Sequence, residues 1–195
     1  MERTSVQRLA RVLRALVIIT FVCNLLVLLL VPGLAALEDG HELEGMFQDL
    51  SRNIKDGYGL HALGHWLMYT LGCFRWVWQS KGAALLTVFF WLCGGCTAVI
   101  LFEAKRTLDT ILAGNPFQFS NAKALRRAAV CCWVISGAAL VRFILWLWAE
   151  GNPSPFFTYN TLAIPAFFMA GLLFQVMSAL FGQAAELKED QDLTI

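Results

Sequence analysis

Apolar residues in this chain come in four long blocks separated by polar connections. The blocks cover residues 12–37, 83–102, 128–149 and 161–182, and each reaches the roughly 20 residues that a helix needs to cross a bilayer. Because backbone groups cannot stay unpaired in hydrocarbon, and because the runs are unbroken, they predict helices and not barrel strands. The pattern therefore predicts an all-α membrane protein, a four-transmembrane-helix bundle forming a single membrane domain over residues 1–195.

Composition agrees with a membrane location. The chain is 58% hydrophobic and 15% charged, whereas soluble domains carry roughly 25% charged residues. The net charge of +1 gives no electrostatic reason to expect direct binding of nucleic acid. The first apolar block is too long for a secretory signal and lacks a clean cleavage site, so we expect a retained anchor.

The basic residues predict the orientation of the helices. Fourteen Lys and Arg residues lie outside the apolar blocks or at their ends, and ten of these fall on one predicted side: Arg3, Arg8, Arg11, Arg14, Lys105, Arg106, Lys123, Arg126, Arg127 and Lys188. The other side has only Arg52, Lys55, Arg75 and Lys81. The positive-inside rule then places both termini, the loop 103–127 and the tail 183–195 in the cytoplasm of a bacterial plasma (inner) membrane.

The outer loop, residues 38–82, has an acidic first half and an aromatic second half. The second half, about 58–79, contains Trp66, Trp76 and Trp78, and aromatic amphipathic segments favour the membrane interface. We therefore expect an interfacial or re-entrant outer segment; a fifth crossing is the alternative, and it would place the termini on opposite faces. His61 and His65 have the i, i+4 spacing of a metal pair, but no further ligands follow at metal spacing, so we expect no metal.

The central cytoplasmic loop contains "GNPFQFSN", residues 114–121, which we call the corner. Helical spacing of apolar residues continues past residue 102, so the second helix is expected to run to Ala113 and to end at a left-handed Gly114. Ser120 or Asn121 is then expected to cap the third helix. The corner is thus predicted to be a tight helix–turn–helix connection at the membrane surface.

Two sets of intramembrane residues suggest chemistry, and each has a structural alternative. Cys93 and Cys96 form C-x-x-C, as in membrane thiol–disulfide enzymes that reduce quinone, but they lie deep in the helix and the outer loop offers only Cys73. We interpret these cysteines as apolar packing residues. Arg142 is expected to be the only unambiguous charge inside the membrane. It lies close enough to the outer surface to reach it, which favours a structural role over a functional site.

Four polar residues, one from each predicted helix, share a predicted depth. Counted from the outer ends, all four lie about 20 Å deep, which predicts a polar layer with interhelical hydrogen bonds rather than a solute path; they are Asn24, Thr97, Ser136 and Gln175.

The tail, residues 183–195, ends the chain with "AELKEDQDLTI". Together with "GNPF" and a following Asn and Leu-Arg in the central loop, this ending resembles a family of small bacterial membrane proteins known as domain of unknown function 2975. The motifs that carry the resemblance, expected to cover the chain from the second helix onward, are Gly114, Asn115, Pro116, Phe117, Asn121, Leu125 and Arg126, then Glu186, Leu187, Lys188, Glu189, Asp192, Leu193, Thr194 and Ile195.

The resemblance implies four transmembrane helices and a gene often beside a Cro/CI-type helix-turn-helix regulator. On that basis the tail acids are candidates for holding a basic regulator. They are equally candidates for an intramolecular clamp on Lys123, Arg126, Arg127 or Arg14. No catalytic set, cofactor motif or soluble pocket occurs in the sequence, which favours a non-enzymatic membrane tether or sensor contacting the lipid bilayer. Oxidoreductase and, after it, small-solute transport are the alternatives.

Overall fold

The structure is a computed structural model that describes residues 2–38, 81–150 and 159–193, together with residues 61, 64, 68, 77 and 78. Four long helices account for these ranges: α1 (Glu2–Glu38), α4 (Lys81–Leu112), α5 (Phe119–Glu150) and α6 (Tyr159–Leu193). Each contains a stretch apolar and long enough to cross a membrane, and no strand occurs in the described ranges. The predicted all-α class and the four spanning helices are confirmed. Most of the aromatic segment 58–79 lies outside the described residues.

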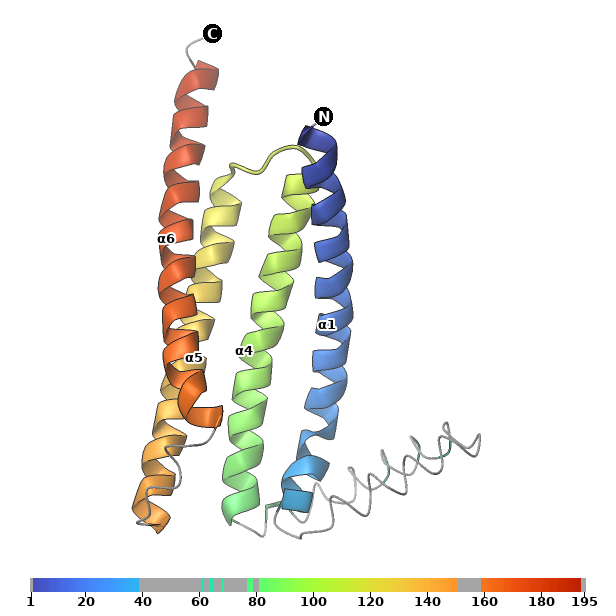
Figure 1. The fold of residues 1–195 in the computed structure, drawn as a ribbon, viewed down its shortest axis with the longest axis vertical. Helices are drawn as coiled ribbons and strands as arrows, with labels where there is room; N and C mark the ends of the chain where they lie inside the picture. The colour runs from blue at the N-terminus through green and yellow to red at the C-terminus, as the bar shows by residue number, and fades with distance from the viewer. Residues whose placement is uncertain are drawn as a thin grey trace. The chain divides into compact units, whose positions relative to one another are not determined.

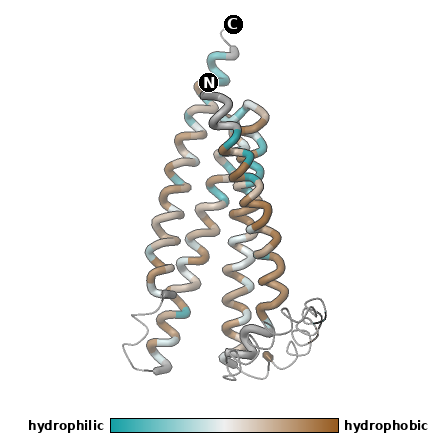
Figure 2. The backbone as a smooth tube through the Cα atoms, turned by 45° about the vertical axis from the view of Figure 1, so that its right-hand side comes forward, coloured by the Kyte–Doolittle hydropathy of each residue, from teal (hydrophilic) through white to brown (hydrophobic). Residues whose placement is uncertain are grey.

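The chain divides into two compact units, and α1 and α4 each contribute to both. The first unit comprises residues 1–24 and 95–195, and the second comprises residues 25–94. In the first unit, the start of α1, the end of α4 and the end of α6 lie at the same end as the corner (Figure 1). Hydrophilic residues gather at this end, and the helical segments away from it are largely hydrophobic (Figure 2).

Helix α5 is the most enclosed of the four. In the most apolar stretch of α5, 33% of the residues are buried, against 11% in α1 and 6% in each of α4 and α6. The buried positions of α5 are mostly small residues: Ala124, Ala128, Ala129, Cys132, Ser136 and Ala139. Small residues allow helix backbones to approach closely, which favours association inside lipid, where apolar burial gives little advantage. Many large apolar side chains of the other helices are exposed, for example Leu29 and Phe168, as lipid contact requires.

Helices α5 and α6 run antiparallel, and two hydrogen bonds fix their register. The Ser136 hydroxyl donates to the Ile164 carbonyl at 2.8 Å, and the Ser178 hydroxyl donates to the Ala122 carbonyl at 2.7 Å. Between these bonds, a Cβ atom added to Gly171 would overlap the Trp133 indole and lie 3.2 Å from the Ala129 carbonyl oxygen. The two helices therefore need glycine at this crossing.

In the second unit, proline chemistry explains a contact between α1 and α4. Pro32 lies inside α1 and has no N–H, so the Leu28 carbonyl loses its usual partner four residues later. The Trp91 indole N–H donates to this carbonyl at 3.2 Å. A Cβ on Gly94 would approach Leu28 Cδ2 to 2.6 Å, so the helices approach closely where the indole supplies the missing hydrogen bond.

Candidate functional site

The corner joins α4 to α5 through a Schellman-type helix end. Gly114 has φ of 82°, the left-handed conformation in which a glycine costs least. The Gly114 N–H donates to the Ile111 carbonyl and the Asn115 N–H to the Thr110 carbonyl, each at 3.1 Å; these two bonds define the motif. The predicted left-handed Gly114 is confirmed, and α4 ends at Leu112, one residue before the expected position.

Asn121 holds the corner together and does not cap α5. Its side-chain amide donates to Thr110 Oγ1 at 2.6 Å and to the Pro116 carbonyl at 2.7 Å, and the residue is 1% exposed. The prediction that Ser120 or Asn121 caps the third helix was wrong, because α5 already begins at Phe119. An Asn close to a helix start is typical of a cap, whose side-chain oxygen accepts from a backbone N–H. Here the amide nitrogen donates to α4 and to the turn, and within the described residues Oδ1 accepts no hydrogen bond.

A carboxylate that the sequence analysis did not single out lies beside the corner. Glu103, in the span of α4, is 4% exposed, and its Oε1 pairs with Arg127 Nη1 of α5 at 2.8 Å. Within the described ranges, Glu103 Oε2 is buried without a hydrogen-bond partner. The expectation that Arg142 is the only unambiguous charge inside the membrane stays a prediction. The sequence pattern that could have predicted this buried acid is the helical spacing of apolar residues, which continues past Glu103. This spacing places the acid on a face of α4 and not in a loop.

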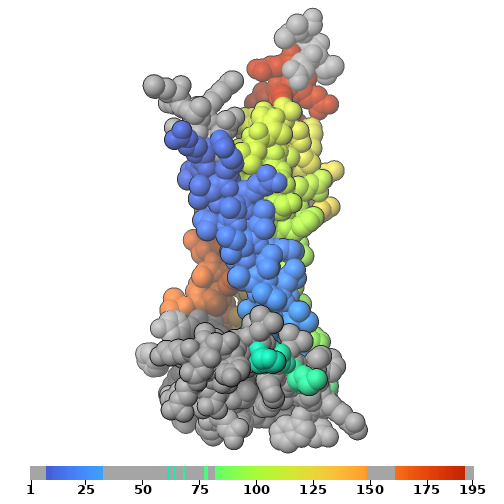
Figure 3. Space-filling model, turned by 90° about the vertical axis from the view of Figure 1, so that its right-hand side faces the viewer, coloured from blue at the N-terminus to red at the C-terminus, as the bar shows by residue number. Residues whose placement is uncertain are grey.

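The N-terminal half of α1 joins the same end of the first unit through Arg14. Its Nε lies 2.8 Å from Asp109 Oδ1 on α4, and Lys105 Nζ lies 3.6 Å from Asp109 Oδ2. Figure 3 shows the first part of α1 directly beside the end of α4. Arg14 and Arg127, two of the residues named for the predicted clamp, thus each have a carboxylate partner on α4, and the clamp on the tail stays a prediction.

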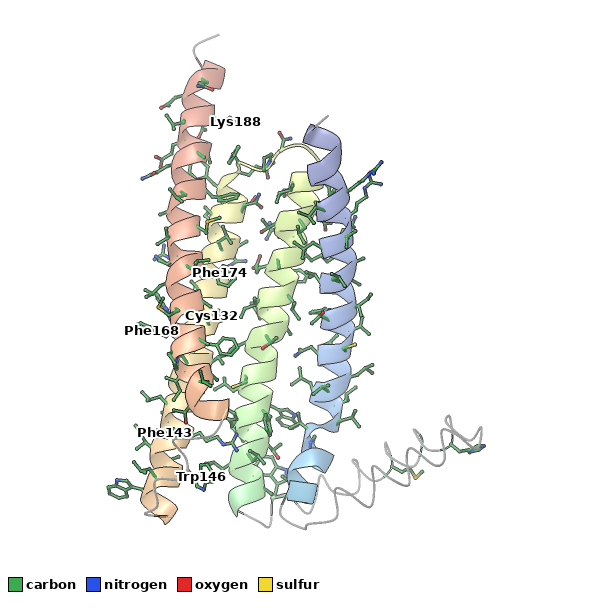
Figure 4. The ribbon with its side chains drawn as sticks, in the orientation of Figure 1. Cys132, Phe143, Trp146, Phe168, Phe174 and Lys188 are labelled. Carbon is green, nitrogen blue, oxygen red and sulfur yellow. The ribbon has the colours of Figure 1, made fainter. Side chains whose placement is uncertain are left out.

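Helix α6 continues past the corner and carries the tail with it. Phe117 and Phe181 rings lie 5.8 Å apart, and Lys188 Nζ donates to Asn115 Oδ1 at 3.3 Å. Figure 4 shows Lys188 on the part of α6 that projects beyond the corner, with Cys132 and Phe174 further along the α5–α6 pair. The two family motifs, in the corner and in the tail, are thus neighbours.

Beyond Ala185, which is 5% exposed, the described side chains of α6 face solvent. The exposed residues are Glu186, Leu187, Lys188, Glu189, Asp190 and Gln191, and Leu187 is 64% exposed. The backbone of Asp192 and Leu193 belongs to the last turn of α6, and Thr194 and Ile195 lie outside the described residues. This arrangement presents carboxylates and one apolar side chain on a helix, without a cavity.

The expected polar layer does not form as a single level. Ser136 pairs with Ile164, which precedes Gln175 by eleven residues on α6, or about 16 Å of helix. Gln175 is exposed, whereas Asn24, Thr97 and Ser136 are at least half-buried, and Asn24 Oδ1 is a buried acceptor without a partner in the described part of the chain. Counting from the outer ends failed because α5 extends past the start of α6, so equal counts do not mean equal depth.

The remaining candidate groups give no defined site. The described cysteines, Cys23, Cys93, Cys96, Cys131 and Cys132, are free thiols, and Cys73 lies outside the described residues. No group of three or more His, Cys, Asp or Glu residues suited to a metal occurs in the part of the chain that the structure describes. His65 lies outside that part. Arg142 is half-buried and engaged in an interaction.

Comparison with known proteins identifies a family for this chain but no function. A model of the family described as Protein of unknown function (DUF2975) matches residues 58–195. The match begins before the second spanning helix, so it includes the aromatic segment that the motif resemblance left out. No curated protein and no solved structure matches the chain.

Proposed function

The chain belongs to the family described as Protein of unknown function (DUF2975), and on this premise we propose that it is a membrane tether for a small helix-turn-helix transcriptional regulator. Its four apolar helices make it a membrane protein. In the proposal, the corner end faces the cytoplasm, in the bacterial plasma membrane, and the regulator docks on the projecting end of α6.

The observation that carries this proposal is the exposure of the acidic end of α6. Glu186, Glu189 and Asp190 are exposed near the end of α6, and Leu187 adds an exposed apolar side chain. A DNA-reading surface is basic because it must attract phosphates. A helix with several carboxylates offers such a surface an alternative partner, and Leu187 adds apolar contact area.

Pairing within the first unit favours docking over a purely internal clamp. Arg14 and Arg127 each already pair with a carboxylate of α4, Asp109 and Glu103 respectively, which supports docking over a clamp that depends on these two arginines. The contact between Lys188 and Asn115 instead holds a basic side chain of the tail toward the corner. This contact favours a fixed direction for the projecting helix, which lowers the ordering cost of binding a partner.

Cell fractionation tests the proposal directly. A tagged regulator encoded beside this protein should be recovered with the membranes when the intact chain is present. The double variant Glu186→Gln/Glu189→Gln should release it to the soluble fraction, because two exposed charges are lost while the helix is preserved. High salt should release the wild-type complex as well, since exposed charges are screened.

A matched control separates specific docking from a general charge effect. The variant Gln183→Lys/Gln191→Lys changes the net charge by the same two units on the same helix and keeps both glutamates. The regulator should remain largely with the membranes in this variant. A regulator that is soluble beside the wild-type protein, or that both double variants release equally, would contradict the proposal.

The oxidoreductase alternative makes a different demand. Under that alternative, Cys93→Ala/Cys96→Ala abolishes the cellular phenotype, because the thiols carry the electrons. Under the tether proposal, regulator retention and phenotype are both unchanged by these substitutions. Measuring the two readouts on the same strain decides between the classes.

A further inference from the structure

A second charged surface lies on the α4–α5 pair, on the membrane side of the corner. Arg106 on α4 and Lys123 and Arg127 on α5 are cationic; we call these three residues the basic patch. The side chain of Arg127 is 62% exposed, and Lys123 and Arg106 are exposed as well. Among the described residues, neither Arg106 nor Lys123 has a carboxylate within ion-pair distance, so their charges are not neutralised within this part of the fold.

The register of the two helices brings the basic patch to one level. Glu103 pairs with Arg127, and Thr110 pairs with Asn121, so the helices run antiparallel with near-equal spacing. Arg106 lies between Glu103 and Thr110 and therefore falls opposite the stretch between Asn121 and Arg127, which contains Lys123. All three cations are consequently within about one helical turn of one another along the axis.

Helical rotation places the cations on one side of the pair. At 100° per residue, Arg106 is rotated about 60° backwards from Glu103, and Lys123 is rotated about 40° backwards from Arg127. In two antiparallel right-handed helices, rotation in the same sense moves both side chains to the same side of the line of contact. Arg106 and Lys123 therefore project from the same face, and Arg127 lies between them at its edge.

Exposed apolar side chains continue this face toward the middle of the spans. Phe102 lies one turn before Arg106 and is 55% exposed, and Val130 lies one turn after Arg127 on the same face and is 49% exposed. Val99 and Val134 extend the same face and are 43% and 39% exposed. The face thus combines a cationic top with an apolar strip below it, which matches the headgroup and acyl chain of a lipid.

We propose that the basic patch binds the phosphate of one anionic phospholipid, whose acyl chain lies along Phe102 and Val130. The partner follows from charge complementarity together with the continuous apolar strip, which a soluble phosphate compound would leave uncovered. This site is independent of the regulator tether, because it uses a different surface and different residues.

Glu103 acts in this site as a positioning residue for Arg127. Its Oε1 bonds one nitrogen of the guanidinium at 2.8 Å, and the carboxylate side chain is only 5% exposed. A guanidinium carries five N–H donors in a rigid plane. Glu103 therefore holds one edge of the Arg127 guanidinium, and the other N–H donors remain available to a phosphate. Because the Arg127 side chain is already ordered, phosphate binding costs little further side-chain entropy.

Native mass spectrometry of the whole protein in detergent micelles tests the proposal. The probes are phosphatidylglycerol and phosphatidylcholine with identical acyl chains. The wild-type protein should retain one phosphatidylglycerol in preference to phosphatidylcholine. The variant Arg106→Gln/Lys123→Gln should lower phosphatidylglycerol affinity about 25-fold. Each Lys or Arg near an anionic lipid surface raises affinity about fivefold, and this variant removes two of them.

Two further variants keep the result interpretable. Arg8→Gln/Arg11→Gln removes the same charge from exposed positions of α1 and should bind phosphatidylglycerol as the wild type does. Arg106→Lys/Lys123→Arg preserves charge and should retain binding, which shows that loss in the Gln variant is not misfolding. Equal retention of both lipids by the wild type, or equal losses in the two charge-removing variants, would overturn the site.

Discussion

The side chain of Asn121 offers the sharpest test of how the corner is built. Substitution by Ala removes the hydrogen bonds to Thr110 Oγ1 and to the Pro116 carbonyl, at 2.6 and 2.7 Å. Each bond contributes about 1 kcal/mol, and acceptors left buried without a donor add about 1 kcal/mol. The change also removes the buried Oδ1, which has no partner in the described part of the chain, and this offsets part of the cost. We expect a net loss of about 2 kcal/mol.

Unfolding by SDS in mixed micelles, followed by far-UV circular dichroism, measures this loss. Asn115→Ala is the matched control, because it deletes the same group from an exposed position of the corner with a single long bond to Lys188. It should cost about 0.5 kcal/mol or less. Thr110→Val removes the Oγ1 acceptor together with the hydroxyl's own hydrogen bond to the Thr107 carbonyl at 2.7 Å. Its effect and that of Asn121→Ala should combine to less than their sum, since the two residues share a bond. Equal stability of the two Asn→Ala variants would refute this reasoning.

Two further predictions concern the close helix contacts. Gly171→Val should destabilise the α5–α6 pair by about 2–3 kcal/mol, measured by the same unfolding assay, because its Cβ overlaps the Trp133 indole; Trp133→Ala should recover part of that loss, and additive losses would contradict the contact. Trp91→Phe should cost about 1 kcal/mol by removing the donor to the Leu28 carbonyl. In a Pro32→Ala background the backbone N–H returns and the cost of Trp91→Phe should fall toward zero; an unchanged cost would contradict the proline explanation.

The corner shows how far local sequence signals reach. Gly114 could be predicted as a left-handed helix end because the requirement is a backbone property of that one residue, and the observed φ of 82° agrees. Asn121 could not be assigned correctly, because a capping Asn and a bridging Asn look the same in sequence. Its partners Thr110 and Pro116 become neighbours only after α4 and α5 fold back on each other.

The charged residues show the same limit. Glu103 and Arg127 are 24 residues apart in the chain, and either could have paired with other groups at the same end of the unit. Charge alone also predicts a clamp on the tail. Only the folding back of α5 on α4 brings Glu103 and Arg127 to 2.8 Å.

The sequence by itself determined that this protein has four apolar helices, two of them joined at a glycine-ended corner, because helix formation in lipid depends on the length and polarity of each segment taken separately. Tertiary structure alone decided which faces meet and at what register. In a membrane the lipid-facing and packed sides of a helix are both apolar, so periodicity does not mark the buried face as it does in water. The register of α5 and α6 instead depends on local fit at Gly171, Ser136 and Ser178, and such fit exists only between helices that are already side by side.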